Sequence, residues 1–304
     1  MDVFEQAIGA ARSLLPGIMC RLHEPMKDHT SFRVGGTVRA MLFPCSEGDM
    51  VALLGLLDEY GVLSLVVGNG TNLLVADGAL DVLVISTKEL RNVCRTGDAE
   101  ITADAGVSLR ELAEFAFECS LSGLEFAHGI PGSLGGAVFM NAGAYASQMK
   151  DVVYATTAYR RDMGICTVVG EEHGFSYRHS RFADTGEIVL SSVLRLVQDD
   201  KLSIRERMEG FAERRRASQP LDLPSAGSTF KRPKDGYAAA LIEDAGLKGF
   251  AIGGAQVSIK HSGFGVNRGD ATFSDVMAVI GHVKEAVLKQ FGIELEPEVR
   301  IVRG

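Results

Sequence analysis

The residues best placed to hold a small anionic ligand lie in a glycine-rich segment, VVGNGTNLL, at residues 66–74. A strand-like run leads into this turn, and a turn of this kind presents several backbone N–H groups to one side, as a pyrophosphate requires. The segment is not a dinucleotide fingerprint, because Leu73 stands at the third glycine position, and it contains no Walker lysine. A tight β-turn built from Gly and Asn explains the same residues equally well.

A second glycine-rich segment, GIPGSLGGA at residues 129–137, carries only small side chains apart from Ile, Leu and Pro. Its main chain can approach a flat or anionic ligand closely, and Pro131 restricts its flexibility. A buried crossing of two backbones would use the same composition. Because both segments adjoin strand-like sequence, one shared ligand is favoured over two independent turns, and the pair predicts a nucleotide-containing cofactor.

The elements that must position these segments alternate between helix and strand. Ser46 and Asp49 are expected to open a helix that Gly61 closes, and Ser108 and Glu111 are spaced as a capping box. The expected order is helix 4–15, strand 38–44, helix 46–60, strand 63–67, strand 100–106, helix 108–120, and strands 151–160 and 187–197. The many short β runs after Gly123 argue against a purely parallel Rossmann sheet.

A strongly charged helical segment at residues 203–220, which Pro220 ends, is interpreted as the domain boundary. Beyond it, the pattern predicts a helix at 236–246 and a second at 274–292, capped by Ser274. Short strands are expected at 256–260 and 264–267, and a terminal strand at 294–304.

Composition narrows the classes of function. The net charge of −8 over 304 residues disfavours nucleic acid as the main partner, because phosphate-backbone binding needs clustered Lys and Arg. Five cysteines without a C-x-x-C motif indicate reduced thiols and a cytoplasmic protein. No apolar run is long enough to span a membrane. His173, His179 and His282 show no metal-ligand spacing, so no metal is expected.

Seven blocks of sequence occur in an order that is specific as a set. They are SFRVGG (31–36), GNGTNLLV (68–75), GLEFAHGIPGSLGGAVFMNAGAY (123–145), YRHS (177–180), PSAGSTFKRP (224–233), GLKGFAIGGAQVSIKHSGF (246–264) and LEPEVR (295–300). With these blocks the chain resembles the UDP-N-acetylenolpyruvoylglucosamine reductase family from about Met26 to Arg300, nearly its whole length. The short spacing between YRHS and PSAGS resembles the compact subclass, which lacks an extra tyrosine-bearing loop.

The resemblance implies an α+β architecture. Residues 1–198 would form an FAD-binding region of the vanillyl-alcohol-oxidase type (PCMH) in two subdomains, and residues 199–304 a C-terminal α+β substrate-binding domain. The terminal strand 293–304 is expected to return to the FAD-binding region.

The resemblance also implies a flavoenzyme that uses NADPH to reduce UDP-N-acetylglucosamine enolpyruvate to UDP-N-acetylmuramate for peptidoglycan. FAD is expected to bind noncovalently, because the first glycine-rich segment contains neither His nor Cys, although His128 adjoins the second. FAD contacts are expected at Gly68, Asn69, Gly70, Thr71, Asn72, Leu73, Gly129, Pro131, Gly132, Ser133, Gly136 and Asn141. The protein is expected to be a monomer without membrane or nucleic-acid partners.

By resemblance, Ser228 is the proton donor, Arg178 contacts the substrate carboxylate, and Glu298 is the acidic partner. A guanidinium and positioned donors stabilise the negative charge that hydride addition creates. From the residues alone, Ser228 could be a turn serine and Arg178 a surface arginine. Alternation along the terminal strand places Glu294, Glu296 and Glu298 on one face, so only the match to LEPEVR selects Glu298.

Two departures from the family pattern affect the basic residues that would hold a diphosphate. Ser218 and Ala240 stand where many relatives have Lys. Arg214, Arg215, Lys231 and Arg232 remain as basic candidates, with Tyr145, Tyr177 and His261 as further expected substrate contacts.

Two alternative functions remain at this point. One is a flavin oxidase or dehydrogenase of the same fold acting on a sugar or hydroxy acid, which is disfavoured because no residue offers a suitable base. The other is a flavin-free binding protein that retains the fold.

Overall fold

The computed structural model describes residues 2–303, and their backbone divides into two compact units. Unit 1 comprises Met1–Leu22, Arg39–Asn69 and Val82–Arg214, and unit 2 comprises His23–Val38, Gly70–Asp81 and Arg215–Gly304. This division differs from the linear one after residue 198. Two N-terminal segments belong with the C-terminal unit, because their apolar side chains join its core.

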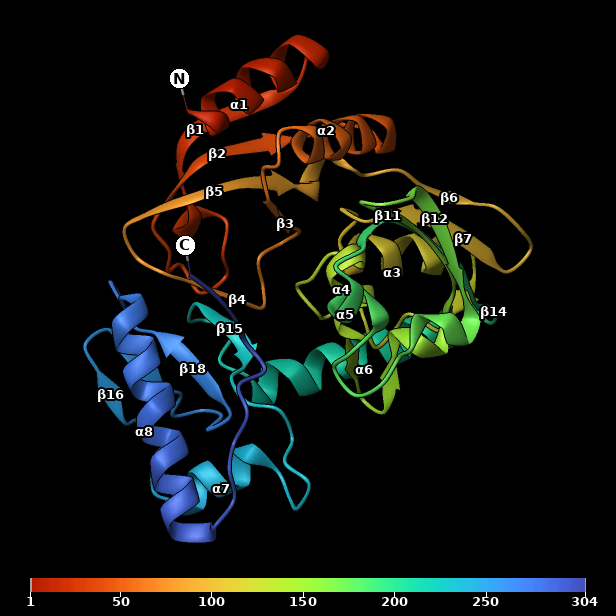
Figure 1. Ribbon diagram of the computed structural model, residues 1–304. Helices are drawn as coiled ribbons and strands as arrows, with labels where there is room; N and C mark the ends of the chain where they lie inside the picture. The colour runs from red at the N-terminus through yellow and green to blue at the C-terminus, as the bar shows by residue number, and fades with distance from the viewer. Residues whose placement is uncertain (1, 304) are drawn as a thin grey trace. The chain divides into compact units, whose positions relative to one another are not determined.

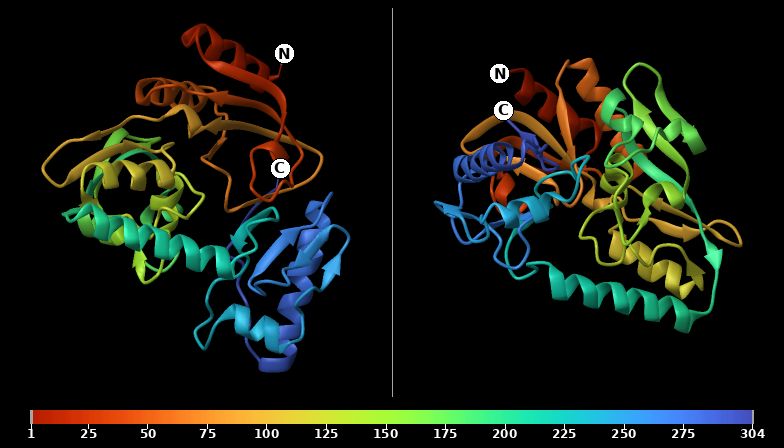
Figure 2. Two further views of the ribbon diagram at one scale, coloured as in Figure 1. Left: turned by 180° about the vertical axis from the view of Figure 1, so that it is seen from behind. Right: turned by 90° about the horizontal axis from the view of Figure 1, so that it is seen from below.

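The first sheet has four strands in the order β1-β2-β5-β3 (Figure 1). Their bounds are β1 Met19–Pro25, β2 Thr37–Phe43, β3 Ser64–Val67 and β5 Ala79–Ser86. Helices α1 (Val3–Leu14) and α2 (Glu47–Glu59) cover one face of it (Figure 2). Their apolar side chains share one core with those of β2 and β5. The apolar side of each helix therefore packs against the apolar side chains of the strands.

Two helix starts in unit 1 confirm the capping predictions. At α2 the Asp49 N–H donates to Ser46 Oγ over 3.0 Å. At α3 (Leu109–Glu118) the Glu111 N–H donates to Ser108 Oγ, and the Ser108 N–H donates back to the Glu111 carboxylate, each over 3.1 Å. These bonds satisfy N–H groups that a helix start leaves without intrahelical partners.

The second sheet of unit 1 is antiparallel, in the order β12-β11-β13-β7-β6. Its strands are β6 Val93–Arg95, β7 Glu100–Asp104, β11 Val153–Arg160, β12 Gly164–Val169 and β13 Ile188–Arg195. Helices α3 and α4 (Leu134–Met140) share a core with β7, β11 and β13. The smaller elements are β8 Leu121–Ser122 with β14 Val197–Gln198, β9 Gly143–Ala144 with β10 Ser147–Gln148, α5 Arg181–Thr185, and 3-10 turns at Met26–Asp28, Thr87–Glu89, Met149–Asp151 and Gly170–His173.

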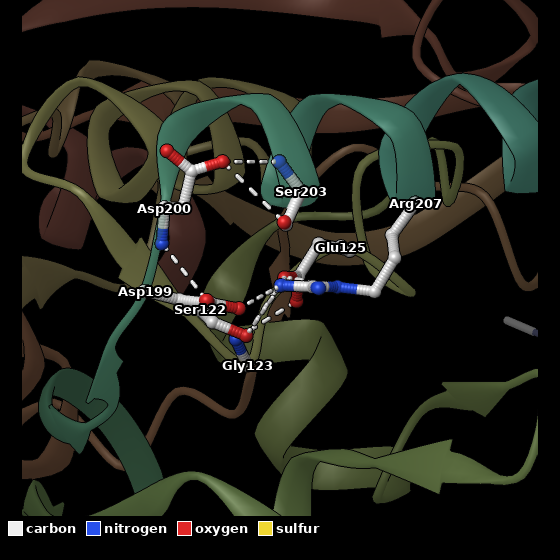
Figure 3. Close-up of polar contacts among 7 residues, drawn as sticks. All are labelled: Ser122, Gly123, Glu125, Asp199, Asp200, Ser203 and Arg207. Atoms are coloured by element: carbon white, nitrogen blue, oxygen red, sulfur yellow. Dashed lines mark hydrogen bonds and ion pairs between the residues drawn. The ribbon is translucent and has the colours of Figure 1, made fainter.

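Helix α6 (Lys201–Ser218) begins in unit 1 and its last residues belong to unit 2. Arg207 fixes its first half by donating to Glu125, Asp199 and Ser122 (Figure 3). Burial raises the pKa of Glu125, but hydrogen bonds, including those from Arg207 and from the Gly123 N–H, outweigh this and hold the pKa below its ordinary value. The carboxylate therefore stays ionised and keeps the guanidinium in place.

Unit 2 contains an antiparallel sheet in the order β15-β18-β17-β16, with α8 packed against it (Figure 1). Its elements are β15 Ser225–Ser228, α7 Ala238–Asp244, β16 Ala251–Ile252, β17 Ala255–Val257, β18 Phe264–Asn267 and α8 Phe273–Phe291. The expected cap at Ser274 is wrong. Thr272 is the N-cap, because it exchanges hydrogen bonds with Asp275, and Ser274 therefore falls inside the helix.

The expected terminal strand at 294–304 is shorter in the structure. Only β19 (Arg300–Val302) is strand, and it pairs in parallel with β4 (Leu73–Val75). Pro297 lacks an N–H group and forms an isolated bridge with Phe230, so the ladder does not extend toward Glu294. The C-terminal strand does return to an N-terminal part of the sequence, but that part lies in unit 2.

Across residues 2–303, no helix is both long and apolar enough to cross a membrane. In the same range, no group of His, Cys, Asp or Glu side chains is arranged to hold a metal ion.

Candidate functional site

In unit 1 the structure brings the two glycine-rich segments together. Gly68 follows β3, and a side chain at this position would overlap the Ser133 hydroxyl. The Asn69 side-chain amide donates to the Pro131 carbonyl over 3.2 Å. The sequence predicted that these segments share one ligand, and the structure places Gly68 and Asn69 in contact with the second segment.

The second segment is held from behind by the backbone of α3 and the turn before it. The Leu109 N–H donates to the Gly132 carbonyl, the Leu134 N–H to the Val107 carbonyl, and the Gly135 N–H to the Ala105 carbonyl, at 2.8–2.9 Å. These bonds leave one edge of the segment open to solvent, where Pro131 and Gly136 are exposed. The segment is therefore rigid on its protein side and open on the other.

The open edge fits a flat anionic group such as a flavin dinucleotide. An added Cβ at Gly136 would meet nothing closer than Ser133 Oγ, at 3.5 Å. In the same unit, among residues 2–303, no backbone carbonyl accepts a hydrogen bond from the N–H of Asn69. Backbone N–H groups and open space beside glycine are what a pyrophosphate needs.

Asn141 differs from the other expected cofactor contacts. It is only 1% exposed and ends α4 in a left-handed conformation, with φ 44°. Its side-chain amide donates to Gln148 and to the Ser176 carbonyl, both at 2.8 Å, and its oxygen accepts from the Lys150 N–H. These partners use the polar atoms of the side chain, so its structural role is to join α4 to the Ser176 turn.

The second half of the first segment lies in unit 2. Gly70 has φ +63°, and a side chain there would overlap the His29 carbonyl oxygen. Its own carbonyl accepts from the Ser31 N–H over 3.2 Å. Asn72 donates through its side chain to the Glu298 carbonyl over 3.1 Å, which connects this segment to the LEPEVR block.

The structure also brings Ser228, at the end of β15, and Glu298, in the segment before β19, into neighbouring segments of unit 2. Ser228 is exposed at the end of β15 and pairs with Phe264. Gly227, at φ +76°, changes the direction of the backbone just before Ser228. The Glu298 N–H donates to the Thr229 carbonyl over 2.8 Å, so the backbone beside Ser228 directly opposes Glu298.

Three acids in the terminal segment could not be ranked from alternation, but their surroundings differ. Glu294 and Glu296 are exposed and lie 3.7 Å from Lys284 and 3.3 Å from Lys231, respectively. Glu298 is partly buried and is held through its backbone on both sides. The surroundings agree with the selection of Glu298 by its motif.

Arg178 lies in unit 1, in a turn closed by a bridge between Ser176 and His179. Its φ is +55°, a conformation rare outside glycine, and its Nη2 donates to the Gly143 carbonyl over 3.2 Å. The guanidinium carbon lies 5.1 Å from the Tyr177 ring centroid. A strained turn that aims one guanidinium is typical of a functional position.

The expected substrate contacts are distributed over both units. In unit 1 the Tyr145 hydroxyl donates to the Phe211 carbonyl, and Arg214 lies over the Phe211 ring. In unit 2 Arg232 lies over the exposed Tyr237 ring, 4.5 Å from its centroid. Tyr145 is therefore already engaged in fixing α6.

His261 belongs to unit 2 and is anchored rather than free to rotate. Its Nδ1 accepts from the Gly263 N–H over 3.1 Å, and its ring packs edge-on against Phe264. Burial lowers its pKa below the ordinary value of 6.5, so the neutral form that accepts this bond is favoured.

Sequence reasoning missed the residues that hold these groups in place. Thr229 bonds to the segments on both sides of it, and Lys260 donates to the Arg216 carbonyl at the end of α6 over 2.6 Å. Thr229 stands next to Ser228 in the AGSTF motif, but no pattern marks a threonine as a junction of hydrogen bonds.

Family models match both parts of the chain. The model described as FAD binding domain matches residues 38–164. The model described as UDP-N-acetylenolpyruvoylglucosamine reductase, C-terminal domain, matches residues 219–302. The expected FAD-binding α+β fold with a C-terminal domain is confirmed.

Individual proteins match over nearly the whole chain. The UDP-N-acetylenolpyruvoylglucosamine reductase of Caldanaerobacter subterraneus subsp. tengcongensis is 47% identical over 281 residues, covering 92% of this chain and 93% of that protein. The Syntrophomonas wolfei reductase is 45% identical over 289 residues, covering 95% and 96%. The alternative of an oxidase is not favoured by these matches.

The solved structures that match this chain agree with the sequence comparisons. The crystal structure of the reductase from Thermus caldophilus matches with a TM-score of 0.80 and 32% identity, covering 94% of this chain and 98% of that chain. Phl p 4, a grass pollen allergen with glucose dehydrogenase activity, matches with a TM-score of 0.52 and 13% identity over 64% of this chain and 44% of that chain, which shows a common fold alone. The full-length matches in sequence and in structure agree with the motif order, and the chain belongs to the UDP-N-acetylenolpyruvoylglucosamine reductase family.

Proposed function

We propose that this chain carries out the reaction of its family through Ser228, Arg178 and Glu298. The reaction reduces UDP-N-acetylglucosamine enolpyruvate to UDP-N-acetylmuramate with NADPH, for peptidoglycan synthesis. The single observation that carries the assignment of roles is the pairing in unit 2, where the Glu298 N–H bonds to the Thr229 carbonyl beside the exposed Ser228. This backbone bond would hold the hydroxyl of Ser228 and the carboxylate of Glu298 in neighbouring segments, as proton delivery requires.

FAD is the cofactor, and when bound it passes a hydride from NADPH to the substrate. The two glycine-rich segments would hold it, with the exposed edge around Pro131 and Gly136 nearest to it in unit 1. Gly70 and Thr71 would supply backbone N–H groups to its diphosphate.

Binding of FAD is proposed to be noncovalent. Neither His nor Cys occurs in residues 66–74, and His128 lies 3.6 Å from Glu114 through Nε2. Acid precipitation should therefore release all of the yellow chromophore into the supernatant. Flavin that stays with the pellet would contradict this and direct attention to His128.

Arg178 is proposed to bind the substrate carboxylate and stabilise the charge that develops on it. A planar guanidinium can donate two parallel hydrogen bonds to a carboxylate, which an ammonium cannot do. Its positive φ and its bond to Gly143 would keep the group aimed when substrate is absent. Arg178→Lys keeps the charge and should cut turnover strongly while leaving the flavin spectrum normal.

Ser228 is proposed to donate the proton to the carbon next to the one that receives the hydride. The NADPH half-reaction needs no such proton, so a variant at this position should separate the two halves of the reaction. In Ser228→Ala we expect reduction by NADPH at close to the wild-type rate and oxidation by the enolpyruvyl substrate slowed about 10²-fold or more. Stopped-flow absorbance at the flavin bands measures both rates.

Two outcomes decide the assignment. Partial recovery in Ser228→Cys, whose group is more acidic, would support direct proton donation. Equal slowing of both half-reactions in Ser228→Ala would remove the acid role from this residue and leave it a structural one.

The remaining proposals concern partners and location. We propose a monomer that works in the cytoplasm without nucleic acid or membrane partners. The net charge of −8 and cysteines that are all unpaired support this proposal. The diphosphate of the substrate is proposed to contact basic residues among Arg214, Arg215, Lys231 and Arg232, since Ser218 and Ala240 offer no charge. Tyr145, Tyr177 and His261 are proposed as further substrate contacts.

A further inference from the structure

Thr229 makes hydrogen bonds to three different partners in unit 2. Its N–H donates to the Gly263 carbonyl over 2.8 Å, and its carbonyl accepts from the Glu298 N–H over 2.8 Å. Its hydroxyl accepts from the Gly265 N–H over 2.7 Å. One residue thus ties the segment after β15 both to β18 and its preceding turn and to the LEPEVR segment.

The hydroxyl bond replaces a ladder bond that the backbone does not make. Along β15 the paired residues are Ser225 and Ser228, whereas along β18 they are Val266 and Phe264, so the first strand carries an extra residue. A bulge of this kind interrupts the regular exchange of N–H and carbonyl groups. The Gly265 N–H lies between the two paired positions of β18, and the side chain of Thr229 supplies its acceptor.

The same residue sets the alignment with Glu298. The segment that starts at Thr229 runs antiparallel to the terminal segment, since the Lys231 N–H also donates to the Glu296 carbonyl over 2.9 Å. A change in the position of Thr229 would therefore move Ser228, its covalent neighbour, and Glu298, its hydrogen-bond partner, relative to each other.

Thr229 borders a small cavity on its inner side. An apolar cavity of unit 2 is lined by Thr229 together with Phe32, Phe230, Phe264 and side chains of α8. Interiors normally restrain side chains by close contact, and a cavity removes contact atoms on one side. The three hydrogen bonds of Thr229 therefore contribute to fixing its orientation on the side where contact atoms are missing.

We propose that Thr229 is a positioning residue, whose hydroxyl bond to Gly265 and two backbone bonds fix the separation of Ser228 from Glu298. This inference rests on the proposed function, because the position of Thr229 affects the reaction only if Ser228 and Glu298 act on substrate. It assigns Thr229 no contact with substrate or cofactor.

The test compares variants with and without the hydroxyl. Thr229→Val removes the acceptor and keeps the branched shape, so oxidation by the enolpyruvyl substrate should slow about tenfold while reduction by NADPH stays within about twofold of wild type. Thr229→Ser keeps the hydroxyl and should restore most of the rate. Thr229→Ala, which adds no volume, serves the same purpose if the valine variant does not fold.

A readout independent of turnover comes from hydrogen exchange at the Gly265 amide. This N–H should be protected in the wild type and in Thr229→Ser, and should exchange faster in Thr229→Val. The matched control is Thr272→Val, because the Thr272 hydroxyl also accepts a backbone N–H, that of Asp275, over 3.1 Å in the same unit. It should lower thermal stability without separating the two half-reactions.

Ser228→Ala is measured beside these variants to separate two kinds of failure. A slow Ser228→Ala together with a wild-type rate in Thr229→Val overturns the positioning role and leaves the proposed function standing. A wild-type rate in Ser228→Ala overturns the proposed function and the positioning role with it. Equal slowing of both half-reactions in Thr229→Val, without rescue by serine, would show a structural role alone.

Discussion

The two glycine-rich segments look alike in sequence, but the space beside their glycines differs. Side chains at Gly68 and Gly70 would overlap groups of the protein itself, the Ser133 hydroxyl and the His29 carbonyl, respectively. At Gly136 the nearest such neighbour is 3.5 Å away and the residue is exposed. The first segment therefore needs glycine for folding, whereas no close protein neighbour requires glycine at position 136, where we propose that FAD lies.

The comparison shows why glycine content alone does not locate a ligand site. A missing Cβ can be required by backbone crossing, by positive φ or by a bound molecule, and the sequence is the same in each case. Substitutions separate these causes, because they act on the free energy of unfolding in the first two cases and on ligand affinity in the third.

The largest effect is expected at Gly70. In Gly70→Ala the new Cβ would meet the backbone oxygen of His29, which cannot rotate away, and φ +63° is itself unfavourable for alanine. We expect a loss of about 3 kcal/mol or more in the free energy of unfolding. Urea unfolding followed by circular dichroism measures it. Wild-type stability in this variant would mean that the first segment is no more constrained than the second.

At Gly136 the expected effect is on FAD rather than on folding. Gly136→Ala places a better helix former in α4 and should raise the stability of the FAD-free protein by about 0.5 kcal/mol. Gly136→Val should weaken FAD binding about tenfold or more by filling the open edge. Fluorescence titration of deflavinated protein measures the affinity, and unchanged affinity in the valine variant would remove this edge from the cofactor site.

The smaller of the two losses in stability is expected at Gly68, because the atom that the new Cβ would meet is the end of a side chain. Gly68→Ala should cost about 1 kcal/mol, since Ser133 can rotate. Combining Gly68→Ala with Ser133→Ala should recover part of the loss, because the hydroxyl that causes the overlap is gone. A double-mutant cycle by urea unfolding measures the coupling. Additive losses would show that the two segments do not touch at these residues.

The elements that carry local signals were predictable from sequence. The capping residues Ser46 and Ser108 begin α2 and α3 as expected, because a cap depends only on residues within one turn. The cap of α8 was misplaced by two residues, at Ser274 instead of Thr272. Ser and Thr are both common N-cap residues, so residue type alone did not distinguish the two positions. The motif order predicted the family and the FAD-binding fold.

What the sequence did not provide depends on contacts between distant segments. Nothing in residues 23–38 or 70–81 indicates that they belong with the C-terminal unit, since their partners are far away in the chain. Asn141 was expected to contact the cofactor because it lies in one of the motif blocks of the family, and the sequence did not show that its side chain makes three internal bonds. The role of Thr229 likewise becomes visible only when Gly263, Gly265 and Glu298 surround it.

The pairing of β4 with β19 has a consequence for how the protein is made. Residues 82–214 complete unit 1 before the last part of the chain leaves the ribosome, whereas β4 must wait for Arg300–Val302. Phe32, Val34 and Leu74, which belong to the core of unit 2, stay exposed on the nascent chain during that interval. Long-range pairing of this kind folds slowly and leaves apolar surface open. Translation thus completes unit 1 first, and the early apolar segments of unit 2 lack their partners until Arg300–Val302 are made.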